Sequence, residues 1–253
     1  MRCEYISHMG SDLTVVNAAR VSFDKESEWM PDILSGVKVS DELHLKQKDI
    51  GLIHYLAKNN HWTPFSHVML TMRETVPIFV ARQRLKHFIG FNTNGASDDH
   101  EGIGMSYNEV SRRYVSDEPE FFFPDVWRGK PINAKQGSSD EIVTMLHYKD
   151  AYGEGLDEDI PITEEYKWFI GEATEFYNRL IANGVAPEQA RMVLPQSMFT
   201  SYYVTGSLPS WARALKLRID GHAQKEIQDL ATQWDEVINA IPELKVSWKA
   251  LTE

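Results

Sequence analysis

The chain has 253 residues, of which 42% are hydrophobic, and its formal net charge is −11. This length can bury a substantial core and suits a single domain over 1–253, while the acidic charge argues against binding a nucleic-acid polymer, because such binding relies on many lysines and arginines. No apolar run approaches the roughly 20 residues of a membrane helix. The single cysteine, Cys3, cannot form an internal disulfide or a thiolate metal cluster. We therefore expect a cytoplasmic protein with no membrane segment and no metal site.

Helical periodicity and one alternating segment define the first part of the chain. Capping and apolar spacing predict helices over 11–20 and 46–59. Alternation of apolar and polar residues predicts a half-buried strand over 67–75. A short helix follows over 76–88, with Pro77 suited to its first turn.

The second half of the chain is predicted to be mainly helical. Residues 115–138 are rich in Pro, Gly and aromatic residues and predict an ordered connection. Aromatic and β-branched residues predict a strand over 198–205. Two strand regions among helices indicate an α+β fold, with mixed helices around a small sheet. The helices predicted here are 139–152, 161–182, 187–193 and 222–240.

The densest set of reactive side chains lies at 106–114, which reads Ser-Tyr-Asn-Glu-Val-Ser-Arg-Arg-Tyr. Arginine offers forked donors that match phosphate oxygens, and Asn and Glu can read the edge of a base. Taken alone, the segment could equally be a solvated polar turn. Upstream, a predicted helix gathers Arg82, Gln83, Lys86 and His87 within about two turns. A glycine-rich, acidic loop at about 91–105 separates the two segments.

Together these segments resemble the signature of the flavin-dependent thymidylate synthases. Ser106, Asn108, Ser111, Arg113 and Tyr114 match the second half of that signature. In the first half, Lys86-His87-Phe88 stands where the family has Arg-His-Arg, and the loop at 91–105 is an insertion between the halves. Other matching blocks follow in order along the chain, at 17–23, 61–67, 77–83, 190–195, 217–218, 222–224 and 226–228.

The resemblance implies a mainly antiparallel sheet and a homotetramer with shared sites. It implies conversion of dUMP to dTMP, with methylenetetrahydrofolate as carbon donor and NADPH as reductant through FAD. Flavin then does work that classical thymidylate synthases assign to a cysteine, and we expect Cys3 to be a structural or surface residue. Two alternatives stay open: a nucleotide-binding regulator that has lost its flavin, and an oligomeric scaffold with no small ligand.

The resemblance also assigns the residues that bind the nucleotide. Methylation at C5 of uracil builds negative charge on N3 and the carbonyl oxygens, which a fixed cation stabilises. Arg218 matches the family position with this catalytic role, although an arginine near a helix C-terminus could also serve the helix dipole. Ser111 and Arg113 match the phosphate pocket, and any one such residue could instead form a surface salt bridge. The residues matched to the nucleotide are Gln83, Lys86, Glu109, Ser111, Arg112, Arg113, Arg191 and Arg218.

Flavin contacts match less closely. Phe88 stands where the family has a cation, and Arg213 could replace that cation. His61 could also serve as a capping or loop-supporting residue. No Gly-x-Gly-x-x-Gly follows a predicted strand, so a Rossmann cofactor site is not indicated. The positions matched to FAD are Ser22, His61, Thr63, Lys86, His87, Phe88, Glu109, Ser207, Arg213 and His222; Ser207, Pro209 and Arg213 stand where the family commonly has Asn, Arg and Asn.

Overall fold

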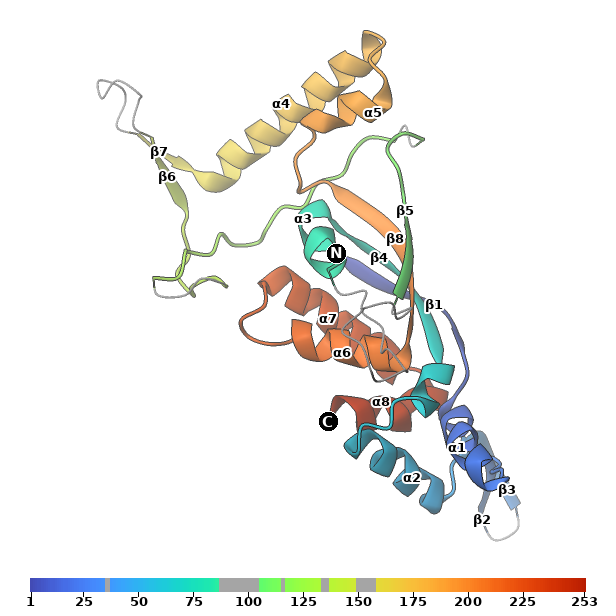
Figure 1. The fold of residues 1–253 in the computed structure, drawn as a ribbon. Coiled ribbons are helices and arrows are strands. Elements are labelled where there is room, and N and C mark those ends of the chain that lie inside the picture. Colours follow the sequence, from blue (N-terminus) through green and yellow to red (C-terminus); the bar gives the residue numbers. More distant parts are fainter. Residues whose placement is uncertain (35–36, 87–104, 115–116, 133–136, 149–157) are drawn as a thin grey trace, which may run out of the picture.

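The structure is a computed structural model that describes residues 1–34, 37–86, 105–114, 117–132, 137–148 and 158–253. Its centre is a four-stranded sheet in the order β1-β4-β8-β5, in which every neighbouring pair is antiparallel (Figure 1). This arrangement confirms the predicted α+β fold with a small antiparallel sheet. The four strands are β1 (Arg2–Met9), β4 (Met69–Pro77), β5 (Met105–Glu109) and β8 (Phe199–Ser207).

The two central strands, β4 and β8, separate the sheet into an apolar face and a polar face. Side chains alternate along a strand, so Leu70, Met72 and Val204 point to one side and are fully buried. The other side carries hydroxyls, among them those of Thr71 and Thr205, which lie 2.9 Å apart. Only the apolar face therefore needs a covering layer.

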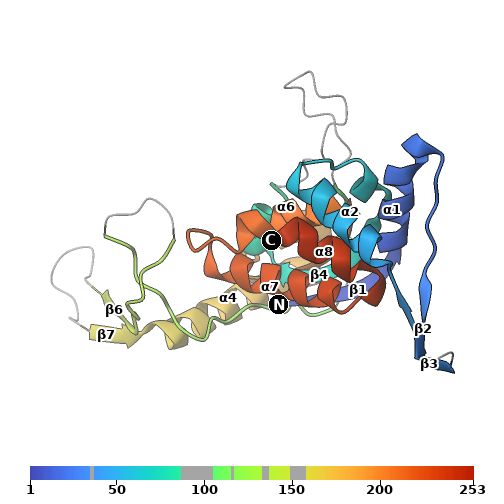
Figure 2. The same ribbon diagram turned by 90° about the horizontal axis from the view of Figure 1, so that it is seen from below.

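Three C-terminal helices provide that layer (Figures 1 and 2). Each contributes a fully buried tryptophan, and the rings of Trp211 and Trp234 pack edge to face with centroids 5.6 Å apart. A second pair of helices packs beside α8. The C-terminal helices are α6 (Leu208–Arg218), α7 (Lys225–Asn239) and α8 (Lys245–Thr252), and the second pair is α1 (Asp12–Arg20) and α2 (Gln47–Lys58).

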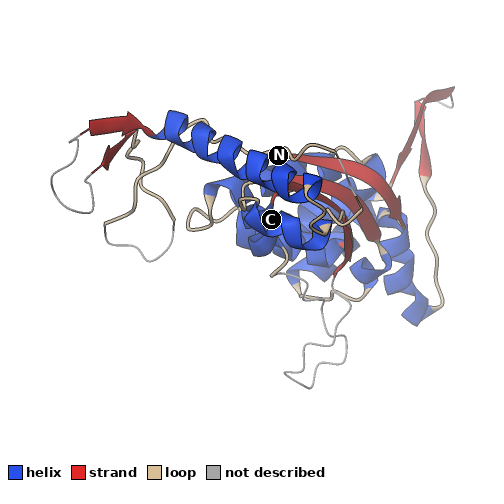
Figure 3. Cartoon of the chain, turned by 90° about the horizontal axis from the view of Figure 1, so that it is seen from above, coloured by secondary structure: helices blue, strands red, loops and turns tan. Residues whose placement is uncertain are grey.

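The remaining elements extend from this body. Figures 2 and 3 show α4 reaching away from the sheet, with the hairpin β6–β7 at its far end and the hairpin β2–β3 on the opposite side of the molecule. None of the helices in the described part of the chain is both long and apolar enough to cross a membrane. These elements are α3 (Ile78–Arg84), α4 (Ile162–Ala182), α5 (Pro187–Ala190), β2 (Met30–Leu34), β3 (Val37–His44), β6 (Met145–Tyr148) and β7 (Glu158–Pro161).

One predicted element is wrong. The described part of the segment 139–152, predicted as a helix, contains β6, which pairs antiparallel with β7. Its residues 142–144 read Ile-Val-Thr, a β-branched run that favours extended backbone. The other helices and both strands predicted from periodicity are confirmed to within a few residues. The predicted insertion at 91–105 lies outside the described residues except for Met105.

Cys3 is a structural residue, as expected. It lies in β1, and its Sγ is 3.2 Å from Sδ of Met72 in the core. Burial, with help from the nearby carboxylate of Glu74, raises the pKa of the thiol far above its usual range. A thiol held in this neutral form is a poor nucleophile.

Candidate active site

The short helix α3 lies between two cavities and supplies residues to both. Pro77 ends β4 and has no N–H to continue the sheet. The next two amides, at the start of α3, donate to the carbonyl oxygens of Met198 (2.9 Å) and Gln196 (3.0 Å), which replace the missing helical partners. This docking fixes the helix against the start of β8. Arg82 and Gln83 are neighbours about 100° apart around the helix, so they line different cavities.

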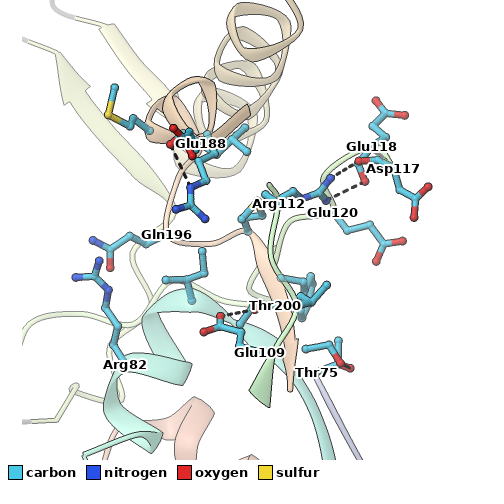
Figure 4. A pocket seen from close by; sticks show the side chains of 18 residues that line it. Thr75, Arg82, Glu109, Arg112, Asp117, Glu118, Glu120, Glu188, Gln196 and Thr200 are labelled. Atoms are coloured by element: carbon cyan, nitrogen blue, oxygen red, sulfur yellow. Dashed lines mark hydrogen bonds between the residues drawn. The ribbon is translucent and has the colours of Figure 1, made fainter. Parts of the chain in front are cut away.

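The first cavity has a volume of about 640 Å³ and is bounded by β4, β5, β8 and α5 (Figure 4). It brings together Glu109, Arg112 and Arg191, three of the residues predicted to bind the nucleotide. The hydroxyl of Thr200 donates to Oε1 of Glu109 at 2.5 Å and so fixes the carboxylate at the cavity wall. Figure 4 shows Arg82 on the side of the cavity away from Arg112.

The arginines of this cavity have different hydrogen-bond partners and therefore different roles. The guanidinium of Arg112 donates to the backbone carbonyls of Asp117 and Glu118, and therefore holds the following turn in place. Nε of Arg191 donates to the carbonyl of Glu188 at 3.3 Å, and its terminal nitrogens have no partner among the described residues, so they are available to a ligand. The Arg112 side chain is thus engaged by the protein itself, and Arg191 and Arg82 are the better candidates for an anion.

Ser111 and Arg113 lie together on the turn that follows β5, beside this cavity. The amide of Tyr114 donates to the carbonyl of Ser111 at 2.9 Å and closes the turn. Nε of Arg113 donates to Oγ of Ser111 at 3.1 Å, and its guanidinium stacks on the Tyr114 ring at 5.0 Å. The pair is therefore assembled, at the surface, as a hydroxyl beside a cation.

The second cavity, of about 610 Å³, brings together Gln83, Arg218 and His222. Nη2 of Arg218 donates to the backbone carbonyl of Gln83 at 2.8 Å. Among the described residues, Nε of Arg218 and Oε1 of Gln83 have no hydrogen-bond partner, although both atoms are buried. A buried donor and a buried acceptor without partners are costly unless a ligand completes them.

The charge of Arg218 survives this environment. Burial, followed by the nearby charge of Arg84, lowers the pKa of its guanidinium. An arginine starts from so high a pKa that it stays protonated at neutral pH. The wall of this cavity therefore contains a fixed cation whose Nε has no hydrogen-bond partner among the described residues.

The residues predicted to contact FAD do not share one cavity within the described chain. Ser22, His61 and Thr63 are exposed near α1 and the 3-10 helix Pro64–His67. Arg213 is exposed on α6 and Lys86 is exposed just beyond α3, where His87 and Phe88 lie outside the described residues.

Two other predicted flavin contacts have partners within the chain. Ser207 is nearly buried and caps α6, where its hydroxyl accepts the amide of Ser210 at 3.4 Å. The exposed ring of His222 lies 2.9 Å from Oδ1 of Asp220. Ser207 thus has a clear structural role, whereas His222 faces the second cavity and solvent.

The sequence alone assigns no role to Arg82 or Thr200, although both line the first cavity. Arg82 belongs to the basic cluster on α3 that the sequence shows, but no matching motif gives it a role. Thr200 has no local signal, because its contact with Glu109 joins residues 91 positions apart in the chain. Only the pairing of β5 with β8 brings them together.

The comparisons with known proteins agree with one another. The family described as "Thymidylate synthase complementing protein" matches residues 4–243. The flavin-dependent thymidylate synthase of Thermosipho africanus is 36% identical over 227 residues, which cover 89% of this chain and 80% of that protein. The flavin-dependent thymidylate synthase of Tropheryma whipplei (strain TW08/27) is 33% identical over 242 residues, covering 92% and 85%. A crystal structure of the UMP/dUMP methylase PolB from Streptomyces cacaoi, bound with 5-Br dUMP, is 27% identical with a TM-score of 0.66, covering 99% of this chain and 94% of that one.

The fold, the arginine-lined cavities and these matches together define an enzyme of the methyltransferase class. Within that class, the chain belongs to the flavin-dependent thymidylate synthase family.

Proposed function

We propose that the protein methylates dUMP to dTMP, with methylenetetrahydrofolate as carbon donor and NADPH as reductant through FAD. Family membership supports this proposal, as does the likeness to a methylase whose crystal structure holds a brominated dUMP. The observation that carries it is the placement of Gln83 and Arg218 together in the wall of the second cavity, where Oε1 of Gln83 and Nε of Arg218 are buried and have no hydrogen-bond partner among the described residues. The edge of uracil presents an N–H donor between two carbonyl acceptors, which complements one acceptor and one donor.

Arg218 would act on the pyrimidine ring electrostatically. When C5 attacks a carbon electrophile, negative charge grows on N3 and on the carbonyl oxygens. A guanidinium that is already in place stabilises this charge without reorganisation, and its partial burial strengthens the effect. Gln83 would orient the same edge of the ring.

The phosphate and the sugar would be held by the other cations. We assign the phosphate to Ser111, Arg113 and Arg191, whose hydroxyl and forked donors match its oxygens. Arg82 is added to this set because it lines the same cavity as Arg191. Lys86 would contact the nucleotide, and Glu109 would lie between the nucleotide and the flavin. The backbone of the turn at Arg112 would face the ligand.

The donor set fits a flavin dinucleotide. A diphosphate and a polyhydroxyl chain are bound by hydroxyls, imidazoles and cations. The set contains the hydroxyls of Ser22 and Thr63, the imidazoles of His61 and His222, and the cations Lys86 and Arg213. FAD, when bound, supplies the hydride for the transferred carbon. Because these residues are spread over the surface of one chain, we propose that FAD is held between copies of a homotetramer.

An exposed apolar face supports this assembly. Trp168, Phe169 and Phe176 are 60%, 50% and 45% exposed on α4, which extends from the body of the chain. Large aromatic side chains that cluster at a surface mark contacts with another protein. A second copy of the chain would cover them.

The test is dTMP formation by the purified protein supplied with FAD, dUMP, methylenetetrahydrofolate and NADPH. The proposal predicts dTMP by chromatography only in the complete mixture, with each omission giving none, and UMP serves as a comparison substrate. A colourless protein that binds dUMP but cannot be loaded with FAD would instead indicate a regulator. Absence of dUMP binding by calorimetry would indicate a scaffold.

A further inference from the structure

A charged cluster lies inside the core, directly behind the proposed nucleotide site. Arg84 is the last residue of α3, and its side chain is 1% exposed. Its Nε lies 3.1 Å from Oε1 of Glu74, whose side chain is fully buried. The guanidinium also stacks against two indole rings, with centroids 5.1 Å away at Trp211 and 4.5 Å away at Trp234. The cation is therefore held on several sides at once.

The cluster reaches the strands of the first cavity as well. Tyr202 is opposite Glu74 in the β4–β8 pairing, and its hydroxyl donates to Oε2 of Glu74 at 2.6 Å. Nη2 of Arg84 lies 3.4 Å from Sδ of Met105, the first residue of β5. Thr200, which holds Glu109, lies two residues from Tyr202 on the same face of β8. The cluster thus joins α3 to both strands that carry Glu109 and its partner.

On the other side, the cluster adjoins the second cavity through Gln83 and through helix α6. Gln83 precedes Arg84 on α3, and its carbonyl accepts the hydrogen bond from Arg218. Arg218 ends α6, the helix whose Trp211 packs on Arg84. A continuous set of contacts therefore runs from Arg218 through Gln83 and the buried cluster to β8.

Stability alone does not call for charges at this place. Burying an ion pair costs desolvation energy, and apolar residues of similar volume are often as stable or more stable. A directional pair does specify one position for the segment that carries it, which an apolar contact does less well. Here that segment is α3.

We propose that the Glu74–Arg84–Tyr202 cluster is a positioning device that holds α3 so that Gln83 and Arg218 together meet the pyrimidine ring. The three residues act through Gln83 and do not touch the ligand. The identity of the ligand rests on the proposed function.

The test separates positioning from stability by removing both charges. Arg84→Met alone leaves a buried carboxylate without its cation and should lower Tm sharply. The double variant Glu74→Gln with Arg84→Met should regain most of the lost Tm, because no uncompensated charge remains. We expect this double variant to bind dUMP about ten-fold more weakly or worse, to raise KM for dUMP to match, and to exchange the amide hydrogens of α3 about ten-fold faster.

A matched control and a milder variant complete the design. Asp12→Asn removes a buried charge that caps α8 far from α3, so its dUMP affinity should stay within about two-fold of the wild type. If the double variant does not fold, Tyr202→Phe decides, and it should weaken dUMP binding about three-fold or more. The proposal would be overturned if the double variant, or Tyr202→Phe in its place, kept wild-type dUMP affinity and wild-type amide exchange in α3. An equal loss of dUMP affinity in Asp12→Asn would also overturn it. If the wild-type protein itself binds no dUMP, the proposed function fails, while amide exchange in α3 still tests the positioning role.

Discussion

Replacing Arg218 by Gln should slow the chemical step and leave the fold intact. The substitution removes the charge, the donor to the Gln83 carbonyl and Nε, which has no partner within the described part of the chain. Loss of one preorganised donor to a developing oxyanion costs roughly 10²–10³ in kcat, or about 2.7–4 kcal/mol. Because Arg218 is only partly buried, water screens some of its field, and we expect the lower end, about 100-fold.

The assay is single-turnover formation of dTMP at saturating dUMP, with the flavin reduced beforehand. Lys249→Gln is the control, because Lys249 is exposed on α8 and pairs with Glu253 at the end of the same helix. That control should keep the wild-type rate. If Arg218→Gln keeps kcat within about three-fold and only raises KM, Arg218 serves ground-state binding and the electrostatic role is refuted.

Three further perturbations have defined outcomes. Burial raises the pKa of Asp12 from 3.8 to about 6, so its contribution to stability is full below pH about 4 and is lost as the pH rises through about 6, by up to about 3 kcal/mol. The free energy of unfolding in urea, compared between wild type and Asp12→Asn, should show this difference between pH 4 and 7. Parallel pH dependence of the two free energies would exclude it. Arg191→Ala should raise KM for dUMP about ten-fold with a smaller change in kcat, and an unchanged KM would remove Arg191 from the phosphate site. Arg213→Ala should weaken FAD binding in a fluorescence titration, and unchanged affinity would show that Arg213 does not replace a cation at Phe88.

Local signals were enough to predict much of the fold. The 21-residue helix α4 carries a sustained helical repeat and ends at Asn183-Gly184, where Gly184 has a φ of +81°, a left-handed value that suits glycine. The central strands β4 and β8 alternate clearly, because one face of each is buried. Strong periodicity over a long segment leaves few alternatives.

Other elements depend on partners that are distant in the sequence. β1 was missed because it is an edge strand with mostly exposed residues and no clear alternation. The hairpin β6–β7 was missed because short strands gain their stability from pairing, which a local pattern does not reveal.

The candidate site divides in the same way. The cluster of Ser111 and Arg113 can be read within a few residues, and Gln83 with Arg218 follows from matching motifs. Their contact joins positions 135 apart and exists only once α3 and α6 are packed. The buried pair of Glu74 and Arg84 gave no signal, since charged residues are ordinarily predicted to be exposed.

In the proposed reaction, electrons pass from NADPH through bound FAD to the carbon transferred to dUMP. The most direct measurement is the absorbance of the bound flavin under anaerobic conditions, followed by analysis of the nucleotide. NADPH should bleach the flavin, and later addition of dUMP with methylenetetrahydrofolate should restore its colour and give dTMP in equal amount. A flavin that stays reduced, or that recovers its colour without dTMP, would contradict this route.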